Sequence, residues 1–542
     1  MSFDRQSRPA LYASALAVAL ASACAGPLNQ IVEDRFDISE ASGVPDITEV
    51  SDVGGGDVPL TGTLPMQSPD GMAVIGETLW IRGKSFGRQP TVRVGGRPAI
   101  VLGRTRDGGI AVRVPPATPS GSVQVVVSNE NGKAERAIAV KRYAAVLAPG
   151  SGQLGWAEVA GDGPGAAAGR TAAAGARYLA LSPDGRAAFL CGSDRSVLDV
   201  IEVPASSGPR PVYKLDLGPA KVLGLAAAAR APVLAMVRAD DIVLIDITSP
   251  IHPARSAPRP LPKEVRRAGV VAVDLAPDGK TLAIATEAGN QVMLIDLSAR
   301  AKAALSATIP VLPDIRESTL VDVAFSPTGD TLWVLSGDTA KSRAIGPQPT
   351  ELRAIRLGAS TDGQGVVAPE FARVVRLGDA VGPVRVGVGR SLPLASGGAI
   401  RLPPERAAVF VAAANRVSPE AASQAAAAPA APSGELAAAQ ATASKPPAAE
   451  PADTGTAVFR VGADDLPAVA LTSAGRFGFP DLTTDGRWLL APALATDGSV
   501  RILAAAVDGR PAPVTRPVDV IAAAAGELPP ASRPAPILRV QP

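Results

Sequence analysis

The stretch "VDLAPDGKTLAIATEAGNQVMLIDLS", residues 273–298, carries the pattern that decides the fold. The pair Asp278-Gly279 separates two apolar runs, and a third apolar run ends in "LIDL". Asp-Gly is a preferred pair for a tight hairpin because both residues tolerate positive φ. The stretch therefore predicts a strand, a turn, a second strand, a loop and a third strand.

A ligand role for the Asp278 carboxylate is the alternative to a turn. Asp184-Gly185 and Asp485-Gly486 hold the same place in similar stretches, but Thr328-Gly329 holds it without a carboxylate. Threonine is a poor substitute for a carboxylate as a ligand, whereas the glycine that the turn requires is present every time. We interpret these pairs as turns.

The same template recurs along the chain after Tyr143. Further copies are "YLALSPDGRAAFLCGSDRSVLDVIEV", "LVDVAFSPTGDTLWVLSG", "FPDLTTDGRWLLAPALATDGSVRILAA" and the degenerate "KVLGLAAAARAPVLAMVRADDIVLIDI". Self-similarity at a period of about 40–50 residues, with several strands per unit, is typical of β-propellers. With one more unit near "RLPPERAAVFVAAANRV", six units can be counted, and a seventh can be assembled from residues 144–160 with the C-terminal "PVDVIAAAAG" and "PILRVQP". The sequence therefore predicts a six- or seven-bladed propeller over residues 144–542, with seven blades favoured.

The "SPDG" and "LIDL" motifs resemble those of YVTN/YncE-like and WD40-like propellers. Some propellers of this general kind are lactonases, with carboxylates and arginines at a central channel.

Residues 418–457 interrupt the repeats with alanine, proline, serine and glutamine and without apolar periodicity. Such a composition does not bury enough surface to offset the entropy of ordering, so we expect a disordered insertion between two strands.

Short apolar runs separated by Gly, Pro and Asn-Gly also fill residues 72–143. The runs are "TLWIRG", "TVRVGG", "IAVRVPP", "SVQVVVSN" and "AIAVKRY". Short strands at this spacing predict a β-sandwich. With "IRGKSFG", "VPP" and "VSNENG", the segment resembles the IPT/TIG immunoglobulin-like family. The resemblance implies a spacer or a binding module for proteins or glycans.

The N-terminus is typical of an exported protein. Residues 1–23 combine two arginines, an apolar stretch too short to span a bilayer and small residues, which predicts a signal peptide. "LASAC" resembles a bacterial lipoprotein signal, which implies lipidation of Cys24; an ordinary signal peptide cut at "ASA" or "ACA" is the alternative. Ala25 after the cysteine implies the outer membrane by the same resemblance. Residues 24–71 are polar and acidic, which predicts a disordered tether.

Composition excludes several functions. A net charge of +2 over 542 residues lacks the basic footprint of nucleic-acid binding, and His252, the only histidine, leaves little for zinc or general-base chemistry. We expect His252 to be a solvated loop residue, with a contact at the rim of a binding face as the alternative. Cys191 lies in an apolar run and is expected to be a buried free thiol.

Three short patterns suggest chemistry that we reject. "GKSFG", residues 83–87, satisfies G-x-S-x-G but opens a predicted sandwich, far from any histidine. "GPGAAAGRT", residues 163–171, lacks the lysine of a phosphate loop and is interpreted as a flexible linker. The pairs Asp240-Asp241 and Asp464-Asp465 are too few for calcium and are interpreted as solvated turns.

Together these features predict an all-β, exported lipoprotein of the outer membrane, facing the periplasm or the cell surface. We expect no catalytic residue, metal or cofactor, and no enzyme activity. The protein would recognise an envelope protein or a polysaccharide through propeller loops, as a monomer or within a hetero-complex, attached to the membrane through Cys24. A propeller enzyme acting on lactones or glycans at a channel site, and a structural spacer or assembly factor of an envelope complex, are the alternatives.

Overall fold

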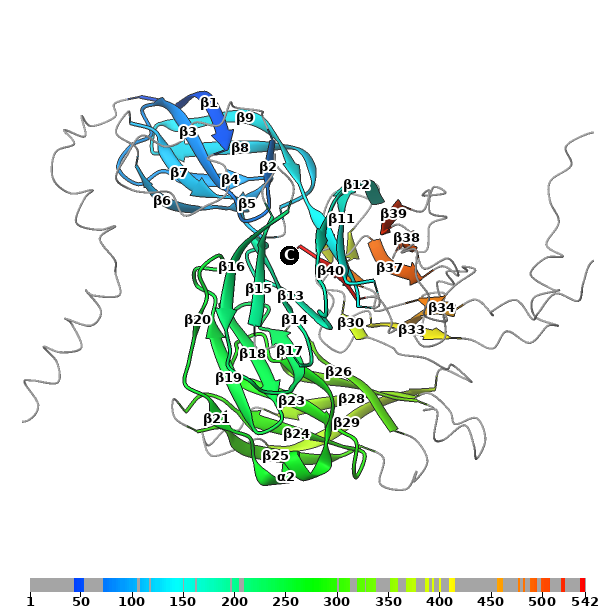
Figure 1. Ribbon diagram of the computed structural model, residues 1–542. Helices are drawn as coiled ribbons and strands as arrows, with labels where there is room; N and C mark the ends of the chain where they lie inside the picture. The colour runs from blue at the N-terminus through cyan, green and yellow to red at the C-terminus, as the bar shows by residue number, and fades with distance from the viewer. Residues whose placement is uncertain are drawn as a thin grey trace, which may run out of the picture. The chain divides into compact units, whose positions relative to one another are not determined.

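Antiparallel strands form nearly all the regular structure in the computed structural model of the chain (Figure 1). The structure describes residues 43–52, 72–104, 108–116, 118–149, 151–160, 163–194, 197–203, 209–299, 302–311, 319–326, 328–337, 351–358, 367–376, 386–388, 392–393, 399–400, 409–414, 456–461, 476–477, 481–482, 488–494, 499–506, 518–521 and 537–541. These residues divide into two units, a smaller one before about residue 140 and a larger one after it.

The smaller unit is a sandwich of two antiparallel sheets. One sheet has the order β1-β3-β7-β6, and the other has the order β2-β9-β8-β4-β5. Valine and isoleucine at alternate positions of these strands are buried, so each sheet turns one face to the core. The strands are β1 (Asp46–Asp52), β2 (Met72–Val74), β3 (Thr78–Lys84), β4 (Thr91–Val94), β5 (Arg97–Pro98), β6 (Ile100–Arg104), β7 (Ile110–Arg113), β8 (Gly121–Asn129) and β9 (Gly132–Lys141).

Strand β1 corrects the predicted boundary of the tether. Residues 46–52 lie inside the segment 24–71, yet they pair antiparallel with β3 and bury Ile47 and Val50. The register shifts between Ile47 and Glu49, so Thr48 is an extra residue in the ladder. This bulge breaks the two-residue period, which is why the acidic segment shows no strand pattern in the sequence.

The larger unit contains a series of antiparallel sheets, most of them four-stranded. In chain order they are β40-β10-β11-β12, β13-β14-β15-β16, β17-β18-β19-β20 with β21, β22-β23-β24-β25, β26-β27-β28-β29, β30-β33-β34 and β35-β37-β38-β39 with β36. A separate pair joins β31 to β32, and the helix α2 (Lys263–Ala268) precedes β22.

The first strands have these bounds: β10 (Tyr143–Ala148), β11 (Gln153–Ala160), β12 (Gly163–Ala172), β13 (Tyr178–Leu181), β14 (Ala187–Cys191), β15 (Val197–Glu202), β16 (Arg210–Asp216), β17 (Val222–Ala227), β18 (Val233–Arg238), β19 (Asp241–Asp246), β20 (Ala254–Arg255), β21 (Arg259–Pro260), β22 (Val270–Leu275), β23 (Thr281–Thr286), β24 (Gln291–Asp296) and β25 (Ala304–Pro310). The later strands are β26 (Thr319–Phe325), β27 (Thr331–Gly337), β28 (Glu351–Gly358), β29 (Val367–Arg376), β30 (Val386–Val388), β31 (Leu392–Pro393), β32 (Ala399–Ile400), β33 (Val409–Ala414), β34 (Thr456–Val461), β35 (Arg476–Phe477), β36 (Asp481–Leu482), β37 (Trp488–Leu494), β38 (Val500–Ala506), β39 (Val518–Ile521) and β40 (Ile537–Val540).

One strand of each sheet contacts its counterparts in the neighbouring sheets. These contacts follow the order β40, β13, β17, β22, β26, β30, β36 and back to β40. The path returns to its start, which is the connectivity of a β-propeller. We call these strands the innermost strands.

The two ends of the larger unit meet in one sheet. Strand β40, from "PILRV", pairs with β10, as expected for a sheet assembled from both ends of the repeats. The segment "VDVI" differs from the prediction: as β39 it pairs with β38, in the preceding sheet.

"GPGAAAGRT" is another correction, because it forms β12 and pairs with β11 through an irregular register. Main-chain pairing, which any residue type can supply, makes this glycine-rich segment a strand rather than a linker.

The third strand of several sheets carries a recurring irregularity, which falls on "LIDL" in one of them. In three sheets the register between the third and fourth strands shifts at the same place. The shift falls between the fourth and fifth residues of the third strand, at Val200/Ile201, Leu294/Ile295 and Ala354/Ile355. A bulge at this position increases the local twist of each outer edge.

Small aliphatic side chains fill the layers between the sheets, as the low aromatic content predicts. Cys191 lies in one of these layers as a free thiol, which confirms its expected burial. Burial, with a smaller contribution from Asp199, raises the pKa of the Cys191 thiol to about 12.

Strands β33 and β34, at either end of the insertion 418–457, pair with each other; residues 418–455 lie outside the described residues. No helix in the described part of the chain is long and apolar enough to cross a membrane.

Candidate recognition surface

The Asp-Gly pairs form tight turns after the innermost strands. Gly185 and Gly279 adopt φ of 77° and 74°, in the left-handed region that favours glycine. The carboxylate of Asp184 accepts the backbone N–H of Arg186 at 3.2 Å, and Asp278 accepts that of Lys280 at 3.0 Å. Each carboxylate closes its own turn, as the sequence interpretation requires. Asp485 lies outside the described residues.

The turn at Thr328 obtains its carboxylate from another position. Asp330 accepts hydrogen bonds from the hydroxyls of Ser326 at 2.9 Å and Thr328 at 2.7 Å, and from Thr331 at 3.2 Å. Burial alone would raise the pKa of Asp330, but the hydroxyl donors outweigh it, so the pKa lies below the usual 3.8. These contacts are also local and serve the turn.

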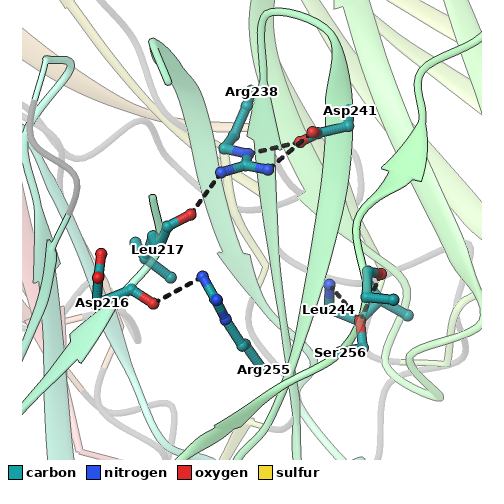
Figure 2. Close-up of polar contacts among 8 residues, drawn as sticks. Asp216, Leu217, Arg238, Asp241, Leu244, Arg255 and Ser256 are labelled. Atoms are coloured by element: carbon teal, nitrogen blue, oxygen red, sulfur yellow. Dashed lines mark hydrogen bonds and ion pairs between the residues drawn. The ribbon is translucent and has the colours of Figure 1, made fainter. Parts of the chain in front are cut away.

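A buried arginine joins two neighbouring sheets (Figure 2). The guanidinium of Arg238, at the end of β18, forms a two-pronged ion pair with Asp241, with N–O distances of 2.5 and 2.7 Å. Its third nitrogen donates to the carbonyl of Leu217, which follows β16 in the preceding sheet, at 2.7 Å. The Arg238 side chain is only 7% exposed, and this geometry is the strongest form of an arginine–carboxylate contact. The contact links the two neighbouring sheets. Asp241, interpreted from the sequence as part of a solvated turn, is therefore the ion-pair partner of the linking arginine.

Outside this buried pair, the same boundary carries exposed polar groups. Arg255 on β20 donates to the carbonyl of Asp216 at 2.9 Å, again from one sheet to the next (Figure 2). The hydroxyl of Ser256 accepts the backbone N–H of Leu244 at 3.2 Å, where β20 leaves the ladder of β19. Both contacts fix the segment that carries the neighbouring histidine.

The single histidine lies against a tyrosine of the adjacent sheet. The rings of His252 and Tyr213 meet edge to face, with centroids 5.6 Å apart and planes at 82°. Tyr213 is 38% exposed, and it lies two residues from Leu215, which packs in the layer between the sheets. The aromatic pair therefore lies at the surface, on the boundary between the two sheets. We call Tyr213, His252 and Arg255 the rim cluster.

The rim cluster has the chemistry of a recognition surface. Tyrosine and arginine are enriched where proteins bind partners, because each combines a large contact area with directed donors. Here both sit on antiparallel sheets that the buried Arg238 contact keeps fixed. A rigid platform reduces the entropy lost on binding.

The innermost strands carry a few carboxylates. Asp274 on β22 accepts the backbone N–H of Phe325 on β26 at 2.7 Å, and Asp322 accepts the N–H of Val323 at 2.9 Å. Asp481 lies on β36. Within the described ranges, no group of three or more histidine, cysteine, aspartate or glutamate side chains is placed to hold a metal ion.

Comparison with known families decides the identity of the smaller unit. Residues 68–140 match the IPT/TIG domain family. This segment is an IPT/TIG domain. A search of curated proteins finds no match to the chain.

Solved structures similar to the chain include β-propellers. The Pseudomonas aeruginosa periplasmic gluconolactonase PpgL is 14% identical, with a TM-score of 0.42, over 74% of this chain and 99% of that protein. The β-propeller domain of Myceliophteria thermophila Cps50 (Swd1) is 13% identical, with a TM-score of 0.39, over 66% of this chain and 95% of that domain. Kuenenia stuttgartiensis hydrazine synthase is 14% identical, with a TM-score of 0.36, over 61% of this chain and 76% of that one.

Within the IPT/TIG domain, "GKSFG" belongs to the end of β3. Ser85 adopts a φ of 59° and Phe86 is buried, so the segment is a turn that anchors an aromatic side chain. His252 belongs to the other unit. The pattern therefore serves the sandwich, as expected.

Sequence reasoning found some of these residues and missed others. It named His252 and Asp241 but not Arg238, Tyr213 or Arg255. The arginine of "RADD" was a usable signal, since a charged residue that ends an apolar strand needs a partner when it is buried. Cys24 and Asp464-Asp465 lie outside the described residues.

Proposed function

We propose that the protein is an exported lipoprotein, anchored through Cys24, that recognises an envelope protein or a polysaccharide without catalysis. A seven-bladed propeller, closed by β40 against β10, would be the rigid part, and the IPT/TIG domain would lie between the anchor and the propeller in the order of the chain. Localisation at the outer membrane follows from the resemblance of the N-terminus to a lipoprotein signal.

The rim cluster is the observation that carries the proposal. Tyr213 and His252 meet across two sheets, and Arg255 bonds across the same boundary. An exposed tyrosine and an exposed arginine on the same boundary between sheets suit two occupants: a polypeptide surface, or a sugar ring whose C–H groups stack on the aromatic face. The contact between His252 and Tyr213 favours the rim role of the histidine over that of an isolated loop residue.

Site-specific crosslinking tests the proposal. A photo-crosslinking amino acid at position 213 in the full chain, expressed in the native envelope, should trap one partner in high yield. The same label at Val271, which is similarly exposed on β22, is the matched control. Arg255→Glu should reduce the crosslink at position 213 several-fold because it reverses an exposed charge on the same boundary between sheets. Equal labelling from both positions would argue against a specific surface.

Anchoring is tested separately. Labelled palmitate should enter the wild-type chain and not Cys24→Ser, and the variant should leave the membrane fraction. Loss of anchoring without loss of the crosslinked partner would separate the two parts of the proposal.

A channel enzyme is the second candidate, because three innermost strands carry Asp274, Asp322 and Asp481. Turnover of lactones or glycans by the full chain, lost in Asp322→Asn, would favour it over recognition alone. A structural spacer, the third candidate, would lose its envelope complex without a ligand of its own.

A further inference from the structure

The last strand of one sheet of the IPT/TIG domain is apolar and exposed. Strand β6 ends the sheet β1-β3-β7-β6, with β7 as its neighbour among the described strands. Ile100 is 67% exposed, and Val101 and Leu102 are each 37% exposed. They supply half of the exposed large apolar side chains in the described residues, the others being Val44, Tyr213 and Val271. An edge strand with this composition is a template for pairing with another chain.

The opposite edge of the same sheet is protected. The bulge at Thr48 interrupts β1, and the guanidinium of Arg136 donates to the Thr48 carbonyl at 2.6 Å. A side chain that occupies an edge carbonyl blocks an incoming strand. Strand β6 has a bulge of its own, between Val101 and Gly103, but among the described residues no side chain donates to the main chain of residues 100–104 as Arg136 does at Thr48. The two edges therefore differ in access.

The exposed edge is basic. Residues 91–113 contain five arginines and one aspartate. Arg93 and Arg97 are exposed on β4 and β5, and Arg104 ends β6. The apolar residues 100–102 thus lie between positive charges.

We propose that β6 is the docking edge for an extended, acidic segment of a partner polypeptide, which adds to the sheet as a further strand. Apolar residues of the partner would cover Ile100 and Leu102, and its carboxylates would face Arg97 and Arg104. Strands rise about 3.3 Å per residue, so a segment of about five to seven residues spans this edge. This is recognition by strand addition, in which main-chain bonds give affinity and side chains give specificity.

The main-chain groups of an edge strand distinguish a polypeptide from other anions. An edge strand presents alternating N–H and C=O groups, and only another peptide backbone satisfies both in register. A lipid headgroup or an acidic glycan would use the arginines but would leave the carbonyls to water. A second copy is disfavoured as the occupant, because β6 of another molecule is equally basic and the acidic β1 is covered by Arg136.

A peptide titration tests the proposal on the full-length chain. The probe is a synthetic seven-residue peptide with glutamate at both ends and alternating valine and threonine between them. We expect saturable binding, together with slower hydrogen exchange of the backbone amides of residues 100–104. The same peptide with lysine at both ends should bind at least about tenfold more weakly, because it repels the arginines.

Two variants locate the site. Ile100→Glu should lower the affinity for the acidic peptide at least about tenfold, because it removes apolar contact and adds a like charge. Arg97→Glu, on the exposed hairpin, should lower it by about threefold without affecting the fold. Val44→Glu, at another exposed valine of the same unit, should leave binding unchanged.

Several results would overturn the proposal. Binding without added protection at residues 100–104, or equal binding of the two peptides, would show that β6 is not the edge used. Association with anionic phosphatidylglycerol vesicles that depends on Ile100, without peptide binding, would assign the edge to a membrane surface. Concentration-dependent dimerisation abolished by Ile100→Glu would assign it to a second copy. None of these results bears on the rim cluster.

Discussion

Strand β26 of the propeller and strand β6 of the IPT/TIG domain each lie at one end of a four-stranded antiparallel sheet. The two strands differ in what covers the edge that is not paired within the sheet. The N–H of Phe325 on β26 donates to the carboxylate of Asp274, which reaches across from β22. Strand β6 instead presents three exposed apolar residues. Each innermost strand of the propeller contacts the innermost strands of its neighbours, which brings side chains such as Asp274 within reach of the next strand.

The comparison indicates that, in a closed ring of sheets, side chains from one sheet bond to main-chain groups at the edges of the next. Arg238 and Arg353 donate to the carbonyls of Leu217 and Val311, which follow the outer strands of the preceding sheets. The sandwich has two ends in each sheet and protects one of them in the same manner, with Arg136 over β1. An edge without such a contact is open for binding.

Removing a protected edge should have the largest effect. A chain that begins at residue 72 lacks β1 and uncovers Leu79 and Ile81 of β3, which are now fully buried. Loss of Ile47 and Val50 from the core should cost the IPT/TIG domain about 4 kcal/mol of unfolding free energy. A chain that begins at residue 43 should keep the native stability.

Hydrogen exchange resolved by peptide measures this difference. The shorter chain should lose protection in β3 and β7, while the propeller strands β14 and β18 remain protected in both chains. Equal protection of β3 in the two chains would show that β1 is an accessory strand and would restore residue 72 as the boundary.

Breaking the buried link between sheets should have the next largest effect. Arg238→Ala leaves Asp241 without its partner and the Leu217 carbonyl without its donor. We expect a loss of about 3 kcal/mol in the unfolding free energy of the propeller, the usual cost of removing one member of a buried pair. Arg255→Ala, an exposed arginine with one contact across the same boundary, should cost less than about 0.5 kcal/mol. Urea denaturation of the full chain, followed by tryptophan fluorescence, compares the two; similar losses would mean that burial does not distinguish the contacts.

Opening an innermost edge should cost less. Asp274→Ala removes the acceptor of the Phe325 N–H, and an unpaired buried donor costs about 1.5 kcal/mol. Asp274→Asn keeps an acceptor oxygen and should recover most of this loss. Faster exchange of the Phe325 amide in the alanine variant alone would identify the cause, and unchanged exchange would show that the carboxylate does not protect this edge.

The repeats and the sandwich could be predicted because each depends on local patterns. Alternating apolar runs and Asp-Gly turns specify strands and their connections, and a period of repetition implies neighbouring sheets. Strand β1 was missed because the bulge at Thr48 interrupts its alternation. Strand β12 was missed because glycine and alanine carry no strand pattern, although main-chain pairing with β11 holds it.

The surfaces were harder to predict because they depend on distant contacts. Arg238 reaches a carbonyl twenty-one residues away in another sheet, and no spacing in the sequence specifies that partner. The run "AIVLG" reads as a buried strand, but its place at the end of the sheet exposes Ile100. Composition states which side chains exist, and topology decides which of them are covered.

The turn that follows β26 should give the smallest effect, and it depends on pH. Burial opposes ionisation of Asp330, but the hydroxyls of Thr328, Ser326 and Thr331 outweigh it and lower the pKa below 3.8. A carboxyl whose pKa is lower in the folded state stabilises the protein above its unfolded pKa, and this stability is lost as the pH falls through the folded pKa. Asp330→Asn should therefore cost about 1 kcal/mol near neutral pH, since solvent screens this partly buried group, and the difference from wild type should shrink as the pH falls below the usual carboxyl pKa of 3.8. Asp278→Asn, in the equivalent Asp-Gly turn with one N–H contact from Lys280, is the control and should show a smaller and flatter difference. If both variants gave the same pH profile by urea denaturation, the hydroxyl cluster would contribute nothing beyond an ordinary turn, and the two forms of the repeated turn would be equivalent.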